Sequence, residues 1–332
     1  MDYFVNLEIK FVVLATSATH GTLYESAQKK YLVWSNLLMI KIEPSQYHLV
    51  LPLVEDVNFD KVFAQAVIDQ IQNGSIFVDN IQHPNTAFIS HFVSGFSLLC
   101  GNQNNDLFNH QLIEIMLKEA NTKPKQIRLV TYPDTWNEKL NNLLGDRLKD
   151  YSVICNDSNL DQDEKIITLK KVLSENVLAF ERVRFKFNKS VFINRQDFFN
   201  QIPKGFKLKR IDEKNYIKIT GKIIPSFSWD TMEKFLSKGI GYCLLKDEMV
   251  VSTSFSSFIS NDMIDVGIET DQNFRGQGLG VYPAAAMIMY CLENGFNPIW
   301  GTNFDNIGSR RVANKLGYEE DFYHPFYCSV LK

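Results

Sequence analysis

A short segment of the chain has the residue types needed to hold a phosphate group: residues 275–280 read Arg-Gly-Gln-Gly-Leu-Gly. Glycine lets the backbone approach a ligand closely, and successive N–H groups can then face an anion. A helix is predicted directly afterwards, over residues 281–293, and the first turn of a helix offers free N–H groups and a partial positive charge. Arg275 adds a cation beside them. The segment therefore predicts a pyrophosphate site.

The spacing of the glycines narrows the kind of phosphate ligand. They stand at 276, 278 and 280, which is G-x-G-x-G. The dinucleotide-binding fingerprint needs G-x-G-x-x-G, and a P-loop needs Gly-Lys followed by Ser or Thr. Neither pattern fits this segment, so a Rossmann site or a nucleoside-triphosphatase site is disfavoured. An antiparallel meander is predicted before the segment and a helix after it, and this context is more specific than the glycines alone.

A second segment with recognisable chemistry is residues 306–318, predicted to form a helix after a strand at 298–301. It begins with Asn-Ile-Gly-Ser and ends with Lys-Leu-Gly-Tyr. Gly317 is placed to close this helix, and Lys315 lies in its last turn. The two segments follow one another in the chain, about 30 residues apart.

Together the two segments resemble the CoA-contacting motifs of the GNAT N-acetyltransferase superfamily. The first is similar to its Arg-Gly-x-Gly-x-Gly loop, and the second to its helix pattern N-x-x-[AS]…[KR]-L-G-[FY]. The resemblance covers residues 39–332 and is most specific over 239–320. Within the superfamily, the chain is similar to the two-domain branch called GNAT acetyltransferase, which includes acetyltransferases of the zwittermicin-resistance type.

The resemblance implies an N-acetyltransferase, an acyltransferase that moves an acetyl group from acetyl-CoA, its co-substrate, to a primary amine of a small molecule. In such enzymes a splayed strand supplies backbone groups to the pantetheine arm, and here that strand is 266–270, with Ile268 and Thr270 as the backbone donors. An N–H there would also polarise the thioester carbonyl. The implied cofactor-binding residues are Ile268, Thr270, Arg275, Gly276, Gln277, Gly278, Leu279, Gly280, Asn306 and Ser309.

Two carboxylates are candidates for the catalytic base that takes the proton of the attacking amine. Asp265 and Glu269 lie four residues apart on a predicted strand, so their side chains point to the same face. Either could accept the proton, directly or through a water molecule. Their nearness to the glycine segment is the only support for this role, and a solvated edge charge is the alternative for each.

The general acid departs from the family pattern. Many GNAT enzymes place a tyrosine seven residues after the helix asparagine, and here Ala313 occupies that position. Substitutes for the missing tyrosine are a water molecule or one of Tyr318, Tyr323, Tyr327 and His324. The departure leaves a second hypothesis open, a non-catalytic acyl-CoA-binding or regulatory protein of the same fold.

The surrounding elements predict an α+β fold with a largely antiparallel sheet and flanking helices. Residues 1–38 are expected to be an extension, 39–200 a degenerate GNAT-like α/β domain, and 201–332 the GNAT acyl-CoA-binding catalytic domain. The order of elements over 86–148, two strands, a helix, a strand and a helix, mirrors that over 249–317. The corresponding loop at 101–106 has one glycine and no arginine, so the first domain is not expected to hold CoA.

Composition bounds the remaining classes of protein. The chain has 332 residues, 35 Lys and Arg and 38 Asp and Glu, for a net charge of −3. This charge disfavours a nucleic-acid binder, and no apolar run is long enough to span a membrane. Five scattered cysteines and six histidines lack ligand spacing, so we expect free, mostly buried thiols, no bound metal and a cytoplasmic location. A homodimer is left open.

Overall fold

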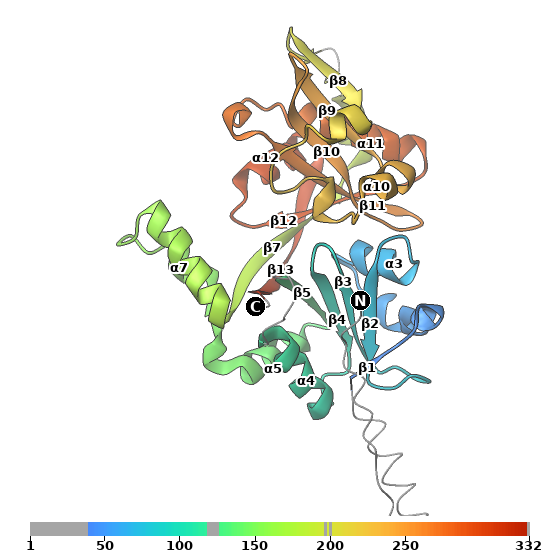
Figure 1. Cartoon of the computed structure of the whole chain (residues 1–332), viewed down its shortest axis with the longest axis vertical. Helices are drawn as coiled ribbons and strands as arrows, with labels where there is room; N and C mark the ends of the chain where they lie inside the picture. The colour runs from blue at the N-terminus through green and yellow to red at the C-terminus, as the bar shows by residue number, and fades with distance from the viewer. Residues whose placement is uncertain (1–38, 118–125, 196–197, 199–200, 331–332) are drawn as a thin grey trace, which may run out of the picture.

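The computed structural model of this chain describes residues 39–117, 126–195, 198 and 201–330. These residues form one mixed, largely antiparallel sheet with helices packed against it, which confirms the predicted α+β class (Figure 1). The extension expected at 1–38 lies outside the described residues. No helix in the described ranges is long and apolar enough to cross a bilayer.

The strands lie in the order β1-β2-β3-β4-β5-β13-β7-β12-β11-β10-β9-β8, and β6 pairs with β7. Their bounds are β1 Ile40–Lys41, β2 Gly74–Val78, β3 Thr86–His91, β4 Phe96–Gly101, β5 Gln126–Tyr132, β6 Leu148–Asp150, β7 Val177–Phe187, β8 Phe206–Arg210, β9 Gly241–Lys246, β10 Met249–Ile259, β11 Met263–Thr270, β12 Asn297–Asn303 and β13 Tyr318–Val330.

The α-helices are α2 Leu51–Val54, α3 Val62–Ile68, α4 Asp106–Leu117, α5 Thr135–Leu144, α6 Tyr151–Cys155, α7 Gln162–Glu175, α8 Lys189–Asn194, α9 Glu213–Tyr216, α10 Met232–Lys238, α11 Val281–Glu293 and α12 Ile307–Lys315. Short 3-10 helices are η1 Pro44–Val50, η2 Gly145–Arg147, η4 Pro225–Phe227 and η5 Gln272–Phe274. The helix α7 extends away from the rest of the molecule (Figure 1).

The two halves of the sheet repeat one topology. In the first half, β3 and β4 are antiparallel, α4 follows, β5 runs parallel to β4, and α5 comes next. In the second half, β10 and β11 are antiparallel, α11 follows, β12 runs parallel to β11, and α12 comes next. This confirms the expected correspondence between residues 86–148 and 249–317.

The long strands β7 and β13 join the two halves by exchange. Residues 182–185 of β7 pair with β12 of the second half, and residues 327–330 of β13 pair with β5 of the first half. The two strands also pair with each other from Tyr318↔Phe187 to Cys328↔Leu178. A boundary at 200/201 would therefore assign β7 to the first half although it lies between β12 and β13 in space. The division at that point stays a prediction.

The exchange predicts that the second half does not fold without the first. A fragment of residues 201–332 lacks β7, which leaves the paired edges of β12 and β13 open and their apolar side chains exposed. We expect poor chemical-shift dispersion for this fragment in a two-dimensional NMR spectrum, and dispersion restored when residues 39–200 are co-expressed as a separate chain. A well-dispersed spectrum of the fragment alone would contradict the expectation.

The core that supports the second half lies between its sheet and α11. This helix is apolar on nearly every side, with Ala284, Ala285, Met287 and Ile288 buried against the strands. All five cysteines are free and four are buried, as predicted.

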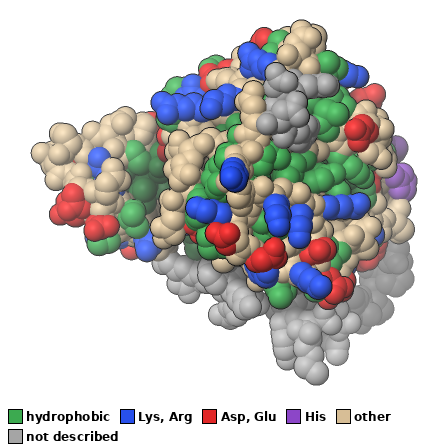
Figure 2. Space-filling view, turned by 90° about the horizontal axis from the view of Figure 1, so that it is seen from above, with side chains coloured by type: hydrophobic (Ala, Val, Ile, Leu, Met, Phe, Trp, Pro, Cys, Tyr) green, Lys and Arg blue, Asp and Glu red, His purple; other side chains and the backbone are tan. Residues whose placement is uncertain are grey.

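The end of the molecule that is uppermost in Figure 1 has an apolar surface with acidic and basic side chains mixed along its border (Figure 2).

Candidate active site

The two central strands of the second half separate part of the way along. In the described chain, β11 pairs with β12 only from Met263↔Asn297 to Asp265↔Ile299. Beyond this point residues 266–270 pair with β10, and Trp300–Asn303 pair with β7. A gap therefore opens in the sheet directly after Asp265.

The backbone of β11 turns alternate residues toward this gap. The N–H of Asp271 donates to the carbonyl of Val251, and the carbonyls of Gly267 and Glu269 accept bonds from the hydroxyls of Ser254 and Ser252 on β10. Backbone groups of successive strand residues point to opposite edges. The N–H and C=O groups of residues 268 and 270 therefore face the gap, where the sequence places backbone donors to the cofactor.

The glycine loop lies between the end of β11 and the start of α11. Gly276 and Gly278 have φ values of +78° and +73°, a region that side chains with a Cβ rarely adopt. At Gly280, the N-cap of α11, a Cβ would lie 2.8 Å from Cδ1 of Ile268, so a larger residue there would require the Ile268 side chain to shift. Among the described side chains none caps the first turn of α11. The N–H groups of Val281 and Tyr282 donate to the carbonyls of Gly278 and Leu279, and Pro283 has no N–H, so these three residues do not offer a ligand the free N–H groups that the sequence predicted.

The two side chains between the glycines behave differently. Gln277 is exposed, whereas Leu279 is 3% exposed and packs with Leu244 and Val251. Leu279 thus anchors the loop on the sheet, and only its backbone is free to contact a ligand.

A second cation reaches the loop from α12. The Nζ atom of Lys315 lies 3.6 Å from the point where a Cβ would stand on Gly278. Sequence reasoning placed Lys315 in the last turn of its helix but did not assign it to the site. The feature that could have assigned Lys315 to the site is its place in the Lys-Leu-Gly-Tyr sequence.

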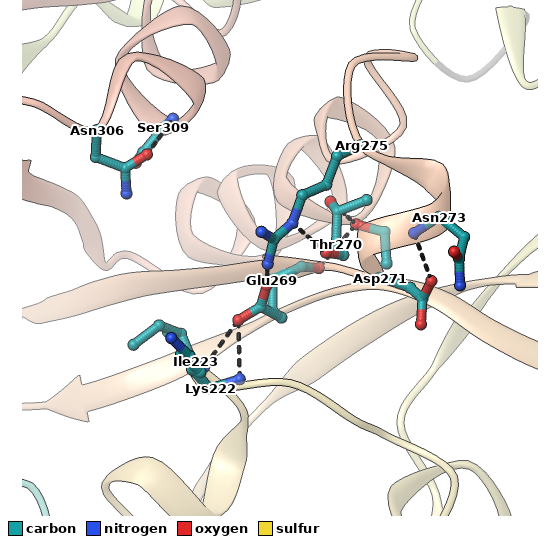
Figure 3. A network of polar contacts seen from close by, with 10 residues as sticks. Lys222, Ile223, Glu269, Thr270, Asp271, Asn273, Arg275, Asn306 and Ser309 are labelled. Atoms are coloured by element: carbon teal, nitrogen blue, oxygen red, sulfur yellow. Dashed lines mark hydrogen bonds and ion pairs between the residues drawn. The ribbon is translucent and has the colours of Figure 1, made fainter. Parts of the chain in front are cut away.

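Glu269 is held on both of its oxygens. Oε2 accepts hydrogen bonds from the N–H groups of Lys222 and Ile223, each at 3.0 Å, and Oε1 pairs with Nη2 of Arg275 at 2.8 Å (Figure 3). The Arg275 Nε also donates to the carbonyl of Thr270 at 3.0 Å. The side chain of Glu269 is 10% exposed and that of Arg275 is 62% exposed. Glu269 therefore holds both the guanidinium of Arg275 and the backbone of the 222–223 turn in place.

Asp265 has a different environment, at the point where the gap begins. It lines a small pocket whose other walls are Asp60, Val62, Phe63, Phe96, Arg182, Phe258 and Ile299. Burial raises the pKa of Asp265 to about 7, and the nearby charge of Asp60 adds to the effect, while Arg182 and a hydrogen bond from Ser257 oppose it. A carboxylate with this pKa both accepts and releases a proton near neutral pH.

Asn306 and Ser309 already have hydrogen-bond partners at the start of α12 and on β12. Asn306 is the N-cap of this helix, and its side chain accepts a bond from the Ser309 N–H at 3.1 Å. The Ser309 hydroxyl accepts a bond from Nε1 of Trp300. Figure 3 shows the pair away from the Glu269–Arg275 contact. A role for them in cofactor binding stays a prediction.

Most of the residues that could replace the missing tyrosine as general acid already make hydrogen bonds within the protein. Ala313 is fully buried. The hydroxyl of Tyr318 donates to the carbonyl of Pro298, and that of Tyr327 donates to Asn137, and both side chains are buried. Tyr323 donates to Glu320. His324 is 3% exposed, and its Nε2 lies 3.4 Å from Asp60. The identity of the acid stays a prediction.

In the equivalent loop of the first half, backbone N–H groups already bond to other residues of the chain. The N–H of Asn102 donates to the carbonyl of Asn85, and the N–H of Asn104 donates to the Asn102 side chain. A Cβ on Gly101 would lie 2.0 Å from the same Asn85 carbonyl. That the first half does not hold CoA stays a prediction.

Comparison with known proteins identifies the family of this chain. A family model described as GNAT acetyltransferase matches residues 52–327. The chain is 27% identical over 276 residues to the uncharacterized N-acetyltransferase YdfB of Bacillus subtilis, covering 82% of this chain and 92% of YdfB. A GCN5-related N-acetyltransferase-like protein from Streptococcus suis has the same fold, with a TM-score of 0.62, 23% identity and coverage of 85% of this chain and 98% of that one.

A Drosophila protein solved by structural genomics also shares the fold, with a TM-score of 0.54, 10% identity and coverage of 88% of this chain and 98% of that one. The family match spans most of the chain, including both halves of the sheet and the glycine loop. The chain belongs to the GNAT acetyltransferase family.

Proposed function

We propose that this protein is an acetyl-CoA-dependent N-acetyltransferase that acetylates a primary amine of a small molecule. The observation that carries the proposal is the gap between β11 and β12, which begins at Asp265 and opens toward the glycine loop. When bound, acetyl-CoA supplies the acetyl group as an activated thioester. The residues present fit such a ligand, because the loop offers left-handed glycines and two cations, Arg275 and Lys315.

Each part of the site has a separate task in this proposal. The loop N–H groups and the two cations bind the pyrophosphate. The backbone of Ile268 and Thr270 orients the pantetheine arm along β11, and an N–H there polarises the thioester carbonyl. Asp265 takes the proton of the amine, because it is poised to titrate near neutral pH and sits where the gap begins.

Glu269 is the less suitable base of the two carboxylates. Both of its oxygens already accept bonds, and using them would release Arg275 and the 222–223 turn. We therefore assign Glu269 to positioning Arg275 for the phosphate, and Asp265 to the proton.

A second function rests on Ala313. The alanine removes the tyrosine that protonates the leaving thiolate in many GNAT enzymes, which favours a protein that binds acyl-CoA without transferring the acyl group. Under the first proposal, water protonates the thiolate, a step that an open gap allows.

Two measurements on the whole chain separate these functions. We expect acetyl-CoA to bind with a micromolar dissociation constant in calorimetry, and free thiol to appear in a thiol-specific colour assay when a panel of primary amines is added. Binding without thiol release from any amine would favour the binding protein. Absence of binding would contradict both proposals.

A further inference from the structure

A buried cluster of charged side chains lies where the two halves of the molecule meet. Nε of Arg182 pairs with Oδ2 of Asp60 at 2.7 Å, and their side chains are only 11% and 6% exposed. Nε2 of His324 lies 3.4 Å from the same oxygen. The three residues come from the segment before α3, from β7 and from β13. No local sequence pattern indicates this cluster, because Asp60 and Arg182 are 122 positions apart.

The cluster is locked in place by its surroundings. The guanidinium of Arg182 lies over the rings of Phe96 and Phe326, at 5.4 Å and 5.0 Å from their centroids. Phe59 packs on the His324 ring at a centroid distance of 4.6 Å. The backbone of β12 also comes close, since a Cβ on Gly301 would stand 2.9 Å from Oδ1 of Asp60. These contacts leave the charges few alternative positions.

The same cluster borders the candidate base. Asp60, Arg182 and Asp265 line one small pocket, whose remaining walls are apolar. Charges that face each other across apolar walls interact more strongly than they would in water. The first half therefore places one negative and one positive charge against the carboxylate at the start of the gap.

We propose that Asp60, Arg182 and His324 are positioning residues which complete the active site from the junction of the two halves and set how readily Asp265 accepts a proton. The inference rests on the proposed function, in which Asp265 is the base. Asp60 disfavours a second negative charge in the pocket, and Arg182 favours it, so the balance of the pair determines the affinity of Asp265 for a proton. The first half thus contributes to catalysis without binding the cofactor.

The other titratable groups around the pocket are accounted for. Burial alone would raise the pKa of Asp60, but Arg182 and the nearby His324 ring hold it well below its usual range, so Asp60 stays charged. Burial lowers the pKa of His91, which packs on Phe258, to about 4 against the opposing charge of Asp230, and His91 is neutral near pH 7. Burial likewise keeps the Tyr318 hydroxyl protonated by raising its pKa well above the usual range.

The test replaces the two charges separately and follows Asp265 directly. Asp60→Asn and Arg182→Gln are compared with the wild type by carbon-detected NMR titration of the Asp265 carboxyl, assigned through its disappearance in Asp265→Asn. We expect the midpoint to fall by about one pH unit in Asp60→Asn and to rise by about one unit in Arg182→Gln. The acidic limb of the kcat profile should move in the same two directions.

Opposite shifts distinguish this role from damage to packing, which would move both variants the same way or neither. The exposed ion pair Asp106–Lys139 provides the control, and Asp106→Asn should leave the midpoint unchanged. Because a lone buried charge can unfold a protein, the double variant Asp60→Asn with Arg182→Gln removes both, and its midpoint should lie between those of the single variants.

Midpoints that do not move, or that move in one direction only, would overturn the inference. The titration needs no substrate, so it is read separately from activity. Opposite NMR shifts in a protein that acetylates no amine would support the coupling and contradict the proposed function. Opposite NMR shifts in an active enzyme whose kcat profile does not follow them would overturn the role in proton transfer.

Discussion

The affinity for acetyl-CoA should fall steeply when Gly278 is replaced by valine. The backbone at this position has a φ of +73°, and a residue with a Cβ pays about 1–2 kcal/mol to stay there. Valine would turn the loop away from this conformation and with it the N–H groups that we propose bind the phosphates. Losing two hydrogen bonds to a charged group, at about 1.5 kcal/mol each, corresponds to about a 100-fold weaker affinity in calorimetry.

Gly295 offers a matched control for this substitution. It follows the other end of α11, has a φ of +78°, and a Cβ there would have no atom within 4 Å. Gly295→Val therefore carries a similar backbone strain away from the loop, and acetyl-CoA should bind it as it binds the wild type. Equal losses in both variants would mean that the effect is general destabilisation and would contradict the assignment of the loop.

The acetylation rate should fall by about 10²–10⁴-fold in Asp265→Asn, while acetyl-CoA affinity stays unchanged. The substitution keeps the size of the side chain but removes its ability to accept a proton. In the wild type, kcat should rise with pH and level off above pH 7, because burial raises the pKa of Asp265 to about 7 and only the ionised form is a base. This acidic limb should be absent from the residual activity of the variant.

Glu269→Gln is the comparison for Asp265→Asn. Its amide oxygen can still accept one of the bonds from the 222–223 turn, but the ion pair to Arg275 is lost. We expect a weaker affinity for acetyl-CoA, by about tenfold, with the pH dependence of kcat retained. If instead Glu269→Gln removes the acidic limb and Asp265→Asn keeps it, the two carboxylates must exchange roles.

Much of the site could be predicted from local sequence. The glycine spacing predicted the loop between a strand and a helix, and the structure places β11 and α11 on either side of it. Gly317 closes α12 with a φ of +84°, as expected. The alternation of the strand residues placed Asp265 and Glu269 on one face. These features depend on a few neighbouring residues, whose conformational preferences act over one or two turns of chain.

The partners of the two carboxylates could not be predicted in this way. Glu269 meets the backbone of Lys222 and Ile223, which are 47 and 46 positions away. Asp265 meets charges from Asp60 and Arg182. The difference between a saturated carboxylate and one that titrates near pH 7 comes from these distant contacts and from burial, and neither is encoded near Asp265 or Glu269 in the chain.

The amino-acid sequence by itself thus determined the glycine loop, the helix after it, the repeat of two similar halves and the family. The tertiary structure alone decided that β7 and β13 cross between the halves, that Lys315 reaches the loop, and that Asp60 and Arg182 stand beside Asp265. The physical reason is range: backbone preference and side-chain periodicity are local, whereas strand exchange and the electrostatics of a buried pocket depend on how the whole chain packs.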